Sequence, residues 1–294
     1  MKKIVLALIL VALMGMLTIP ALAIEHGEYP DRLVLGMVPS REANKLVENL
    51  EPLAAYLSEA IGVDVYTYIS TSYTGLIEAM GKGKVDIGLF GPFGMVLAEQ
   101  RYGVKIVANT VRYGANQYRA QFNVRADSGI DSLEDIKGKT VAFVDPASAS
   151  GYLFPYVFLK NELGIDPEKD INYIFAGGHD AGVLAVYNGD VDVALSFEDA
   201  RTTIEDEHPD VMEKVKVIGY TNYIPNDGAV VRKELDNALI DKIVGALVEM
   251  GETEEEVKIL DDIFDANGFA ETSSENYEVV RDTYELMKDQ ITEL

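Results

Sequence analysis

The stretch DPASASGY, residues 145–152, joins a β-branched apolar run at 140–144 to a helical pattern at 153–163. The first backbone N–H groups of a helix have no intrahelical partner, and the helix dipole places partial positive charge there. A strand followed by small hydroxyl residues that open a helix therefore predicts a cradle for an oxyanion. The alternative is that Ser148 or Ser150 is only an N-cap. One cap needs a single hydroxyl, whereas this stretch has two, followed by Gly151, which lets backbone approach closely.

The same alternation of short apolar runs and longer helical patterns extends to both sides of this stretch. Strands are predicted at 33–38, 63–69, 85–90, 104–111, 140–144, 171–175, 191–195 and 215–218, with a half-exposed crossing strand at 117–124 and a turn at 224–227. Helices are predicted at 44–60, 74–81, 93–101, 153–163, 180–187, 198–205, 235–250, 254–264 and 276–291. Helices that alternate with apolar strands are typical of an α/β fold with parallel strands.

The change of pattern at 117–124 divides the chain into two units. We predict an α/β fold of two lobes joined by two crossings, with lobe one formed by residues 24–116 and 228–294 and lobe two by residues 117–227. Two such lobes leave a cleft between them, and the carboxyl ends of their parallel strands face it. Binding residues are therefore expected just after strands.

The N-terminus has the pattern of a secretory signal. Lys2 and Lys3 precede an apolar run at 4–19, and Ala21-Leu22-Ala23 has the small-residue spacing of a cleavage site. We expect export to the periplasm or the extracellular space, with cleavage after Ala23. An uncleaved segment that tethers the protein to the membrane is the alternative.

Composition excludes several classes of function. The formal net charge of −24 makes nucleic acid an improbable partner. The chain contains no Cys, which excludes disulfides, a thiol nucleophile and a thiolate metal site. His26 and His208 lie in polar segments away from His179, so a His-rich metal site is not expected, and no cofactor is predicted.

Polar and aromatic side chains follow several predicted strands. Tyr73 and Thr74 open a helix, Thr74 as a candidate cap and Tyr73 as a candidate ligand contact. His179 follows two glycines at a helix start, where an imidazole can donate to an anion while Asp180 orients it. Tyr118 lies on the crossing strand, in position to cover the cleft. Packing is the alternative for the histidine and both tyrosines, and packing is also favoured for the segment Phe90-Gly91-Pro92-Phe93.

Two carboxylates pose the question of specificity. Glu198 follows a strand and Asp227 lies at the second crossing. If both face the cleft, they repel a bare oxyanion and suit a zwitterion whose amine lies opposite its acid group. The alternative is that they are surface acids of a strongly acidic chain.

Four segments together resemble a known family: residues 145–155 (DPASASGYLFP), 177–190 (GGHDAGVLAVYNGD), 73–80 and 224–232. They are similar to the phosphonate/phosphite/phosphate-type solute-binding proteins of ABC transporters, which have the two-lobed periplasmic-binding-protein fold (type II-like). The resemblance implies that five residues hold the phosphorus oxyanion: Tyr73, Tyr118, Ser148, Ser150 and His179. It also implies that Glu198 and Asp227 meet an aminoalkyl group where the ligand carries one.

One position departs from the family pattern. Ala149 stands where relatives usually carry Ser or Thr, so a hydroxyl is lost while the backbone N–H remains for the ligand. We expect a monomeric receptor that closes its lobes around a phosphonate or phosphite, with phosphate as a further candidate, and delivers it to the permease subunits of an ABC importer. An enzyme on the same scaffold, with His179 as acid and base beside Asp180 or Glu198, is the alternative. A sensory ectodomain would need an attached signalling domain.

Overall fold

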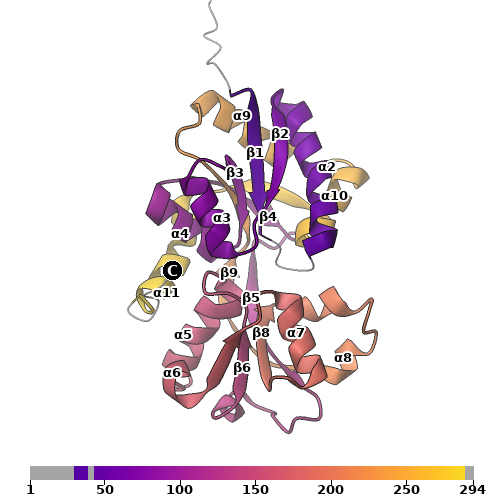
Figure 1. Cartoon of the computed structure of the whole chain (residues 1–294), viewed down its shortest axis with the longest axis vertical. Coiled ribbons are helices and arrows are strands. Elements are labelled where there is room, and N and C mark those ends of the chain that lie inside the picture. Colours follow the sequence, from indigo (N-terminus) through magenta and orange to yellow (C-terminus); the bar gives the residue numbers. More distant parts are fainter. Residues whose placement is uncertain (1–29, 39–42, 289–294) are drawn as a thin grey trace, which may run out of the picture.

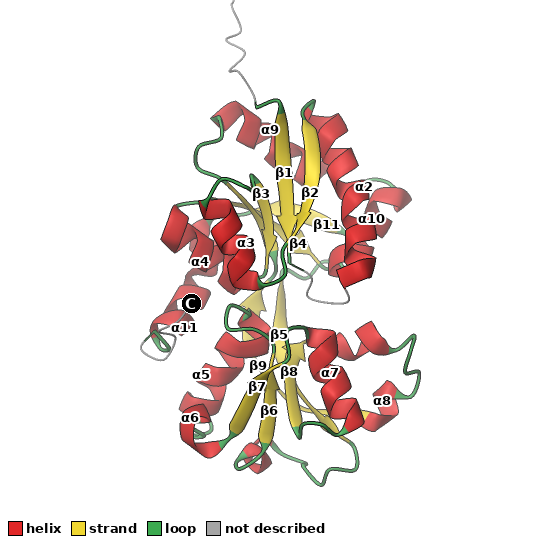
Figure 2. Ribbon diagram, in the orientation of Figure 1, coloured by secondary structure: helices red, strands yellow, loops and turns green. Residues whose placement is uncertain are grey.

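Two β-sheets flanked by helices lie one above the other and are linked by two strands (Figure 1; Figure 2). The computed structural model describes residues 30–38 and 43–288, so the predicted signal or anchor at 1–23 lies outside the described residues. We keep the names lobe one and lobe two for the parts around the two sheets. In the described part of the chain, no helix combines the length and the apolar character that a membrane span requires.

Lobe one contains a six-stranded sheet in the order β11-β4-β10-β3-β1-β2. Its strands are β1 (Arg32–Met37), β2 (Asp64–Ile69), β3 (Ile87–Phe90), β4 (Lys105–Val111), β10 (Gly228–Val231) and β11 (Gly268–Glu271). Strand β1 pairs in parallel with β2 and β3, whereas β10 pairs antiparallel with both β3 and β4. The helices of this lobe are α2 (Ala43–Ile61), α3 (Tyr73–Gly81), α4 (Pro92–Tyr102), α9 (Asn237–Glu249) and α10 (Glu254–Phe264).

Lobe two contains a five-stranded sheet in the order β7-β6-β8-β5-β9. Its strands are β5 (Gln117–Arg125), β6 (Thr140–Phe143), β7 (Asn172–Phe175), β8 (Val193–Phe197) and β9 (Val215–Pro225). Strand β6 is parallel to β7 and β8, and β5 is antiparallel to β8 and β9. The α-helices of this lobe are α5 (Phe154–Asn161), α6 (Pro167–Asp170), α7 (His179–Asn188) and α8 (Val211–Lys214).

The two crossings lie side by side. They run from β4 to β5 and from β9 to β10, and β5 pairs with β9 from Gln117–Pro225 to Arg125–Val215. The fully buried side chain of Asn226 ties the crossings together, because its amide donates to the carbonyl oxygens of Thr110 and Ala115, each at 2.9 Å. The Tyr277 hydroxyl donates to the Asn226 carbonyl at 3.1 Å.

Local sequence sets the helix ends that frame the space between the lobes. Helix α4 begins with Pro92, whose missing N–H costs nothing in a first turn, and ends at Gly103 in the left-handed conformation, φ 68°. Helix α7 is capped by Gly178 and ends in the same way at Gly189, φ 81°. Both helices therefore start directly after a strand and point their N-termini toward the opposite lobe (Figure 2).

The fold class was predicted correctly, but several elements differ from the sequence prediction. The predicted turn and return crossing at 224–227 is shorter than expected, because β9 continues to Pro225 in register with β5 and only residues 226–227 link it to β10. The predicted helix at 198–205 is wrong: Asp199 is left-handed, φ 64°, and only a 3₁₀ helix (Ala200–Ile204) follows. The predicted helix at 276–291 is shorter within the described residues, with a 3₁₀ turn (Ser274–Tyr277) followed by α11 (Glu278–Glu285). Strands β10 and β11 were missed, and β10 separates β4 from the parallel strands.

Candidate ligand-binding site

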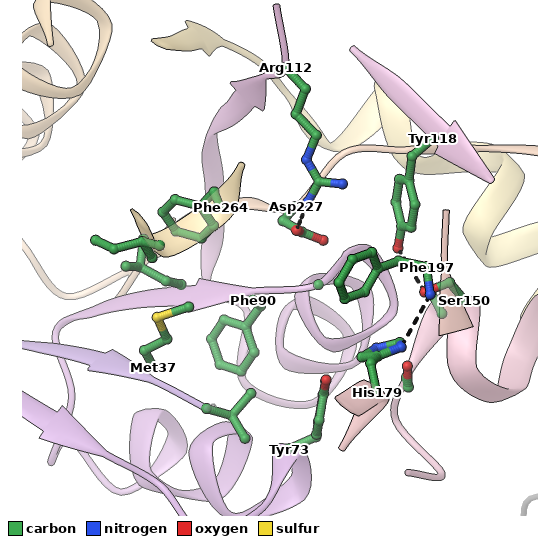
Figure 3. A pocket seen from close by; sticks show the side chains of 16 residues that line it. Met37, Tyr73, Phe90, Arg112, Tyr118, Ser150, His179, Phe197, Asp227 and Phe264 are labelled. Atoms are coloured by element: carbon green, nitrogen blue, oxygen red, sulfur yellow. Dashed lines mark hydrogen bonds and ion pairs between the residues drawn. The ribbon is translucent and has the colours of Figure 1, made fainter. Parts of the chain in front are cut away.

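A cavity of about 50 Å³ lies between the lobes, at the carboxyl ends of their strands. Met37, Phe90 and Phe197, which end β1, β3 and β8, all line it. The cavity also receives residues from the crossings, namely Arg112, Tyr118 and Asp227 (Figure 3). The site is thus formed by both lobes and by the segments that join them.

The loop after β6 supplies a buried, polar wall. Ser148 and Ser150 line the cavity and are 3% and 2% exposed. Ser148 is the N-cap of a π-helical turn (Ala149–Leu153), and its hydroxyl oxygen accepts from the Gly151 N–H at 3.1 Å. Its own hydrogen is still available to a ligand, as is the Ala149 N–H in the first turn. The capping role of Ser148 is therefore compatible with binding.

Gly151 is required for packing against the strand below the loop. A Cβ at this position would lie 2.4 Å from Cβ and Cγ2 of Val144. The sequence suggested that Gly151 allows a close approach of the backbone, and the structure shows that its backbone approaches the Val144 side chain.

His179 begins α7 and is 4% exposed in the cavity wall. Its Nδ1 accepts a hydrogen bond from the Phe197 backbone N–H at 3.2 Å, and the two rings are 4.8 Å apart. An Nδ1 that accepts must be unprotonated, so the neutral imidazole carries its proton on Nε2. The hydrogen bond from the backbone of β8 therefore fixes the tautomer in which Nε2–H is the hydrogen-bond donor.

Two tyrosine hydroxyls complete the polar part of the cavity. Tyr73, 5% exposed, is the first residue of α3, and Tyr118, 7% exposed, lies on β5 and donates to Ser150 Oγ at 3.4 Å. Burial, reinforced by the charge of nearby carboxylates that include Asp227, raises the pKa of both tyrosines. Both phenols therefore stay protonated donors at neutral pH.

Replacing Tyr73 with Phe is expected to lessen the loss of folding free energy in alkali. Since burial raises the pKa of Tyr73 in the folded protein, the unfolded chain ionises first, near pH ~10. The stability linked to this group is present below that pH and is lost as pH rises toward the folded-state pKa. Urea unfolding at pH 8 and pH 11 measures the loss. Tyr66→Phe, at an exposed position of β2, is the control, and an equal loss in Tyr73→Phe and the wild type would contradict the expectation.

The remaining predicted residues have different surroundings. Ser72, not Thr74, caps α3 by accepting from the Gly75 N–H, and Thr74 is not among the residues that line the cavity. Glu198 is also absent from the lining, and it forms an ion pair with Arg119, whose guanidinium lies 4.0 Å from the Tyr220 ring centre.

Asp227 lines the cavity but is paired with a cation. Its Oδ2 lies 2.6 Å from Arg112 Nη2, and the Arg112 guanidinium is 5.1 Å from the Tyr118 ring centre. The structure therefore brings seven of the nine predicted residues to the cavity: Tyr73, Tyr118, Ser148, Ala149, Ser150, His179 and Asp227. No group of His, Cys, Asp and Glu suited to hold a metal ion occurs among residues 30–38 and 43–288.

Sequence reasoning missed the cation and most of the apolar wall. Arg112 directly follows the strand at 105–111. Binding residues were expected just after strands, so Arg112 could have been predicted from its position. Phe197 and Met37 also fit that expectation. Ile263 and Phe264 end helix α10, and no local pattern connects them with the cleft.

Residues 35–277 match the sequence profile of a family described as ABC transporter, phosphonate, periplasmic substrate-binding protein. The chain belongs to this phosphonate-binding family. The match includes every residue assigned above to the polar wall, to the apolar wall and to the Arg112–Asp227 pair.

Individual relatives agree with this membership of the phosphonate-binding family. The chain is 31% identical to the phosphonates-binding periplasmic protein of Escherichia coli, over 80% of this chain and 71% of that protein. It is 35% identical to the phosphate-import protein PhnD of Mycolicibacterium smegmatis, over 58% of this chain and 56% of that protein. A binding protein component of an ABC phosphonate transporter from Pseudomonas aeruginosa has the same fold, with a TM-score of 0.80, 29% identity, and coverage of 88% and 86% of the two chains.

Proposed function

We propose that the protein is the extracytoplasmic receptor of an ABC importer and binds a small phosphorus oxyanion between its lobes. The observation that carries this proposal is the convergence of neutral, buried donors on one cavity. Tyr73 approaches from lobe one, Ser148, Ser150 and His179 from lobe two, and Tyr118 from a crossing strand. Hydrogen bonds from such donors to an anion are charge-assisted and strong where water is excluded.

The neutral donors matter because the negative net charge of the protein opposes the binding of an anion. A chain with a formal net charge of −24 repels anions at long range, so the attraction has to arise locally. The N-terminal turns after β6 and at the start of α7 provide it, because unpaired N–H groups and the helix dipole favour negative charge there. The Arg112–Asp227 ion pair, which is part of the cavity wall, adds no net charge.

Lobe closure is the proposed mechanism. The ligand bridges lobe one and lobe two, and it therefore stabilises the closed state over any open one. We further propose the ranges 24–116 with 228–294 and 117–227 as the two moving lobes, export directed by residues 1–23, delivery to permease subunits, and function as a monomer.

Titration calorimetry with a panel of anions tests the proposal. We expect one-to-one binding of at least one phosphorus compound among methylphosphonate, 2-aminoethylphosphonate, phosphite and phosphate. Sulfate and molybdate are tetrahedral anions without phosphorus and serve as controls. The absence of heat with every phosphorus compound, or binding of sulfate or molybdate alone, would contradict the proposed ligand class.

A further inference from the structure

We propose that the site takes a phosphorus oxyanion whose fourth substituent is apolar and carries no amine, and that Arg112 sets this preference by pairing with Asp227. The inference rests on the proposed function and specifies its ligand. Two features of the cavity support it: the pairing of the carboxylates and the chemistry of the wall.

Each carboxylate that the family resemblance assigns to an amine is paired with an arginine. Asp227 and Arg112 are 2.6 Å apart, with side chains only 22% and 19% exposed. Glu198 is paired with Arg119 and does not line the cavity. An ammonium group that approached Asp227 would have to compete with a guanidinium that also lies over the Tyr118 ring.

The ion pair affects the binding of a ligand with an ammonium group and the binding of a simple oxyanion in opposite directions. Asp227 and Arg112 together carry no net charge, so a buried ammonium would give up its hydration for little compensating attraction. The same neutrality removes the repulsion that an unpaired Asp227 would exert on a bare oxyanion. Arg112 thus disfavours a zwitterion and favours a simple anion.

The wall opposite the donors of lobe two is mostly apolar, with Asp227 at its edge beside Phe264 (Figure 3). In Figure 3, Tyr118, Ser150 and His179 lie on one side of the view, and Met37, Phe90 and Phe264 on the other. Leu89 and Ile263 also contribute to the lining, whereas the Phe197 ring lies on the side of the donors, 4.8 Å from the His179 ring. If the three oxygens of the ligand face the polar donors, its fourth substituent meets carbon atoms, which suit a P–H or P–CH₃ group.

Calorimetry on the full chain with methylphosphonate, phosphite and 2-aminoethylphosphonate tests the inference. We expect the wild type to bind methylphosphonate or phosphite at least about tenfold more tightly than 2-aminoethylphosphonate, the factor that corresponds to one lost charge-assisted contact. Arg112→Gln exposes the charge of Asp227 to the ligand, and we expect it to reduce this ratio by about tenfold or more. The double variant Arg112→Gln/Asp227→Asn removes both charges and is expected to restore most of the ratio.

Arg119→Gln is the matched control, because it breaks the other arginine–carboxylate pair outside the cavity lining. An unchanged ratio in Arg119→Gln is expected. A ratio that shifts in Arg119→Gln but not in Arg112→Gln would place the discrimination at Glu198 and overturn the inference. Tight binding of 2-aminoethylphosphonate to the wild type would also overturn it while leaving the proposed function intact, whereas failure of all three ligands and of phosphate to bind would refute the proposed function itself. Thermal unfolding of each variant shows whether it is folded.

Discussion

His179→Ala is expected to weaken the binding of the phosphorus oxyanion by a factor of ten or more. The substitution removes the Nε2–H donor, and it leaves the Phe197 backbone N–H without the Nδ1 acceptor that lies 3.2 Å away. A hydrogen bond to a charged group contributes about 1.5–3 kcal/mol, which corresponds to a factor of roughly 10 to 150 in affinity. Titration calorimetry with the tightest ligand of the panel measures the change.

His208→Ala provides the comparison for this experiment. His208 packs on the Tyr187 ring, with centroids 4.5 Å apart, and does not line the cavity. We expect its affinity to equal that of the wild type. An affinity of His179→Ala within twofold of the wild type would assign His179 to packing and leave the oxyanion to the hydroxyl groups and the backbone.

Asn226→Ala is expected to lower the free energy of unfolding by about 1–3 kcal/mol and to weaken ligand binding as well. The amide of Asn226 donates to Thr110 and Ala115, and no side-chain group of alanine replaces it. The Thr110 carbonyl, which also accepts from Asn109 Nδ2 at 3.2 Å, loses the shorter of these two side-chain hydrogen bonds in a region that water reaches poorly. Because these bonds hold the two crossings together, their loss also loosens the geometry that lobe closure requires.

Urea unfolding and calorimetry of the same variant measure both effects. Asn222→Ala, on the exposed part of β9, is the control and is expected to change stability by less than about 0.5 kcal/mol. Equal stability of Asn226→Ala and Asn222→Ala would show that the crossings do not depend on this amide.

The strand–loop–helix units were predictable because local chemistry determines them. The stretch 145–152 has a strand before it, a capping Ser148 within it and a helical pattern after it, and each feature acts over a few residues. The same is true of Gly91-Pro92 before α4 and of Gly178-His179 before α7. These units place the polar part of the cavity, which explains why most candidate residues were found at strand ends.

The missed parts depend on contacts between distant segments. Strand β10 has only four residues, and its place between β3 and β4 is fixed by pairing with strands more than a hundred residues away. Arg112 meets Asp227 across a separation of 115 residues, and Arg119 meets Glu198 across 79. Pattern reasoning identified the two acids but had no means to show that each is already paired. The sequence therefore left open whether the ligand carries an amine, and the two ion pairs are the observation on which our proposal against an amine rests.

Helix α11 joins the two lobes on one side of the molecule. Helix α11 contacts α4 of lobe one and both β9 and the Ala149–Leu153 turn of lobe two, and Tyr284 packs on Phe93 with ring centroids 5.2 Å apart. Val280 and Met287 are buried in an apolar cluster shared with both lobes. If the proposed lobe movement keeps these contacts, we expect it to rotate about the α11 side and to widen the distance between α10 and α7, which lie on the other side of the molecule (Figure 1). Such a rotation withdraws the apolar residues at the end of α10 and leaves the hydroxyl and imidazole donors of lobe two assembled, ready to receive the anion before the lobes close.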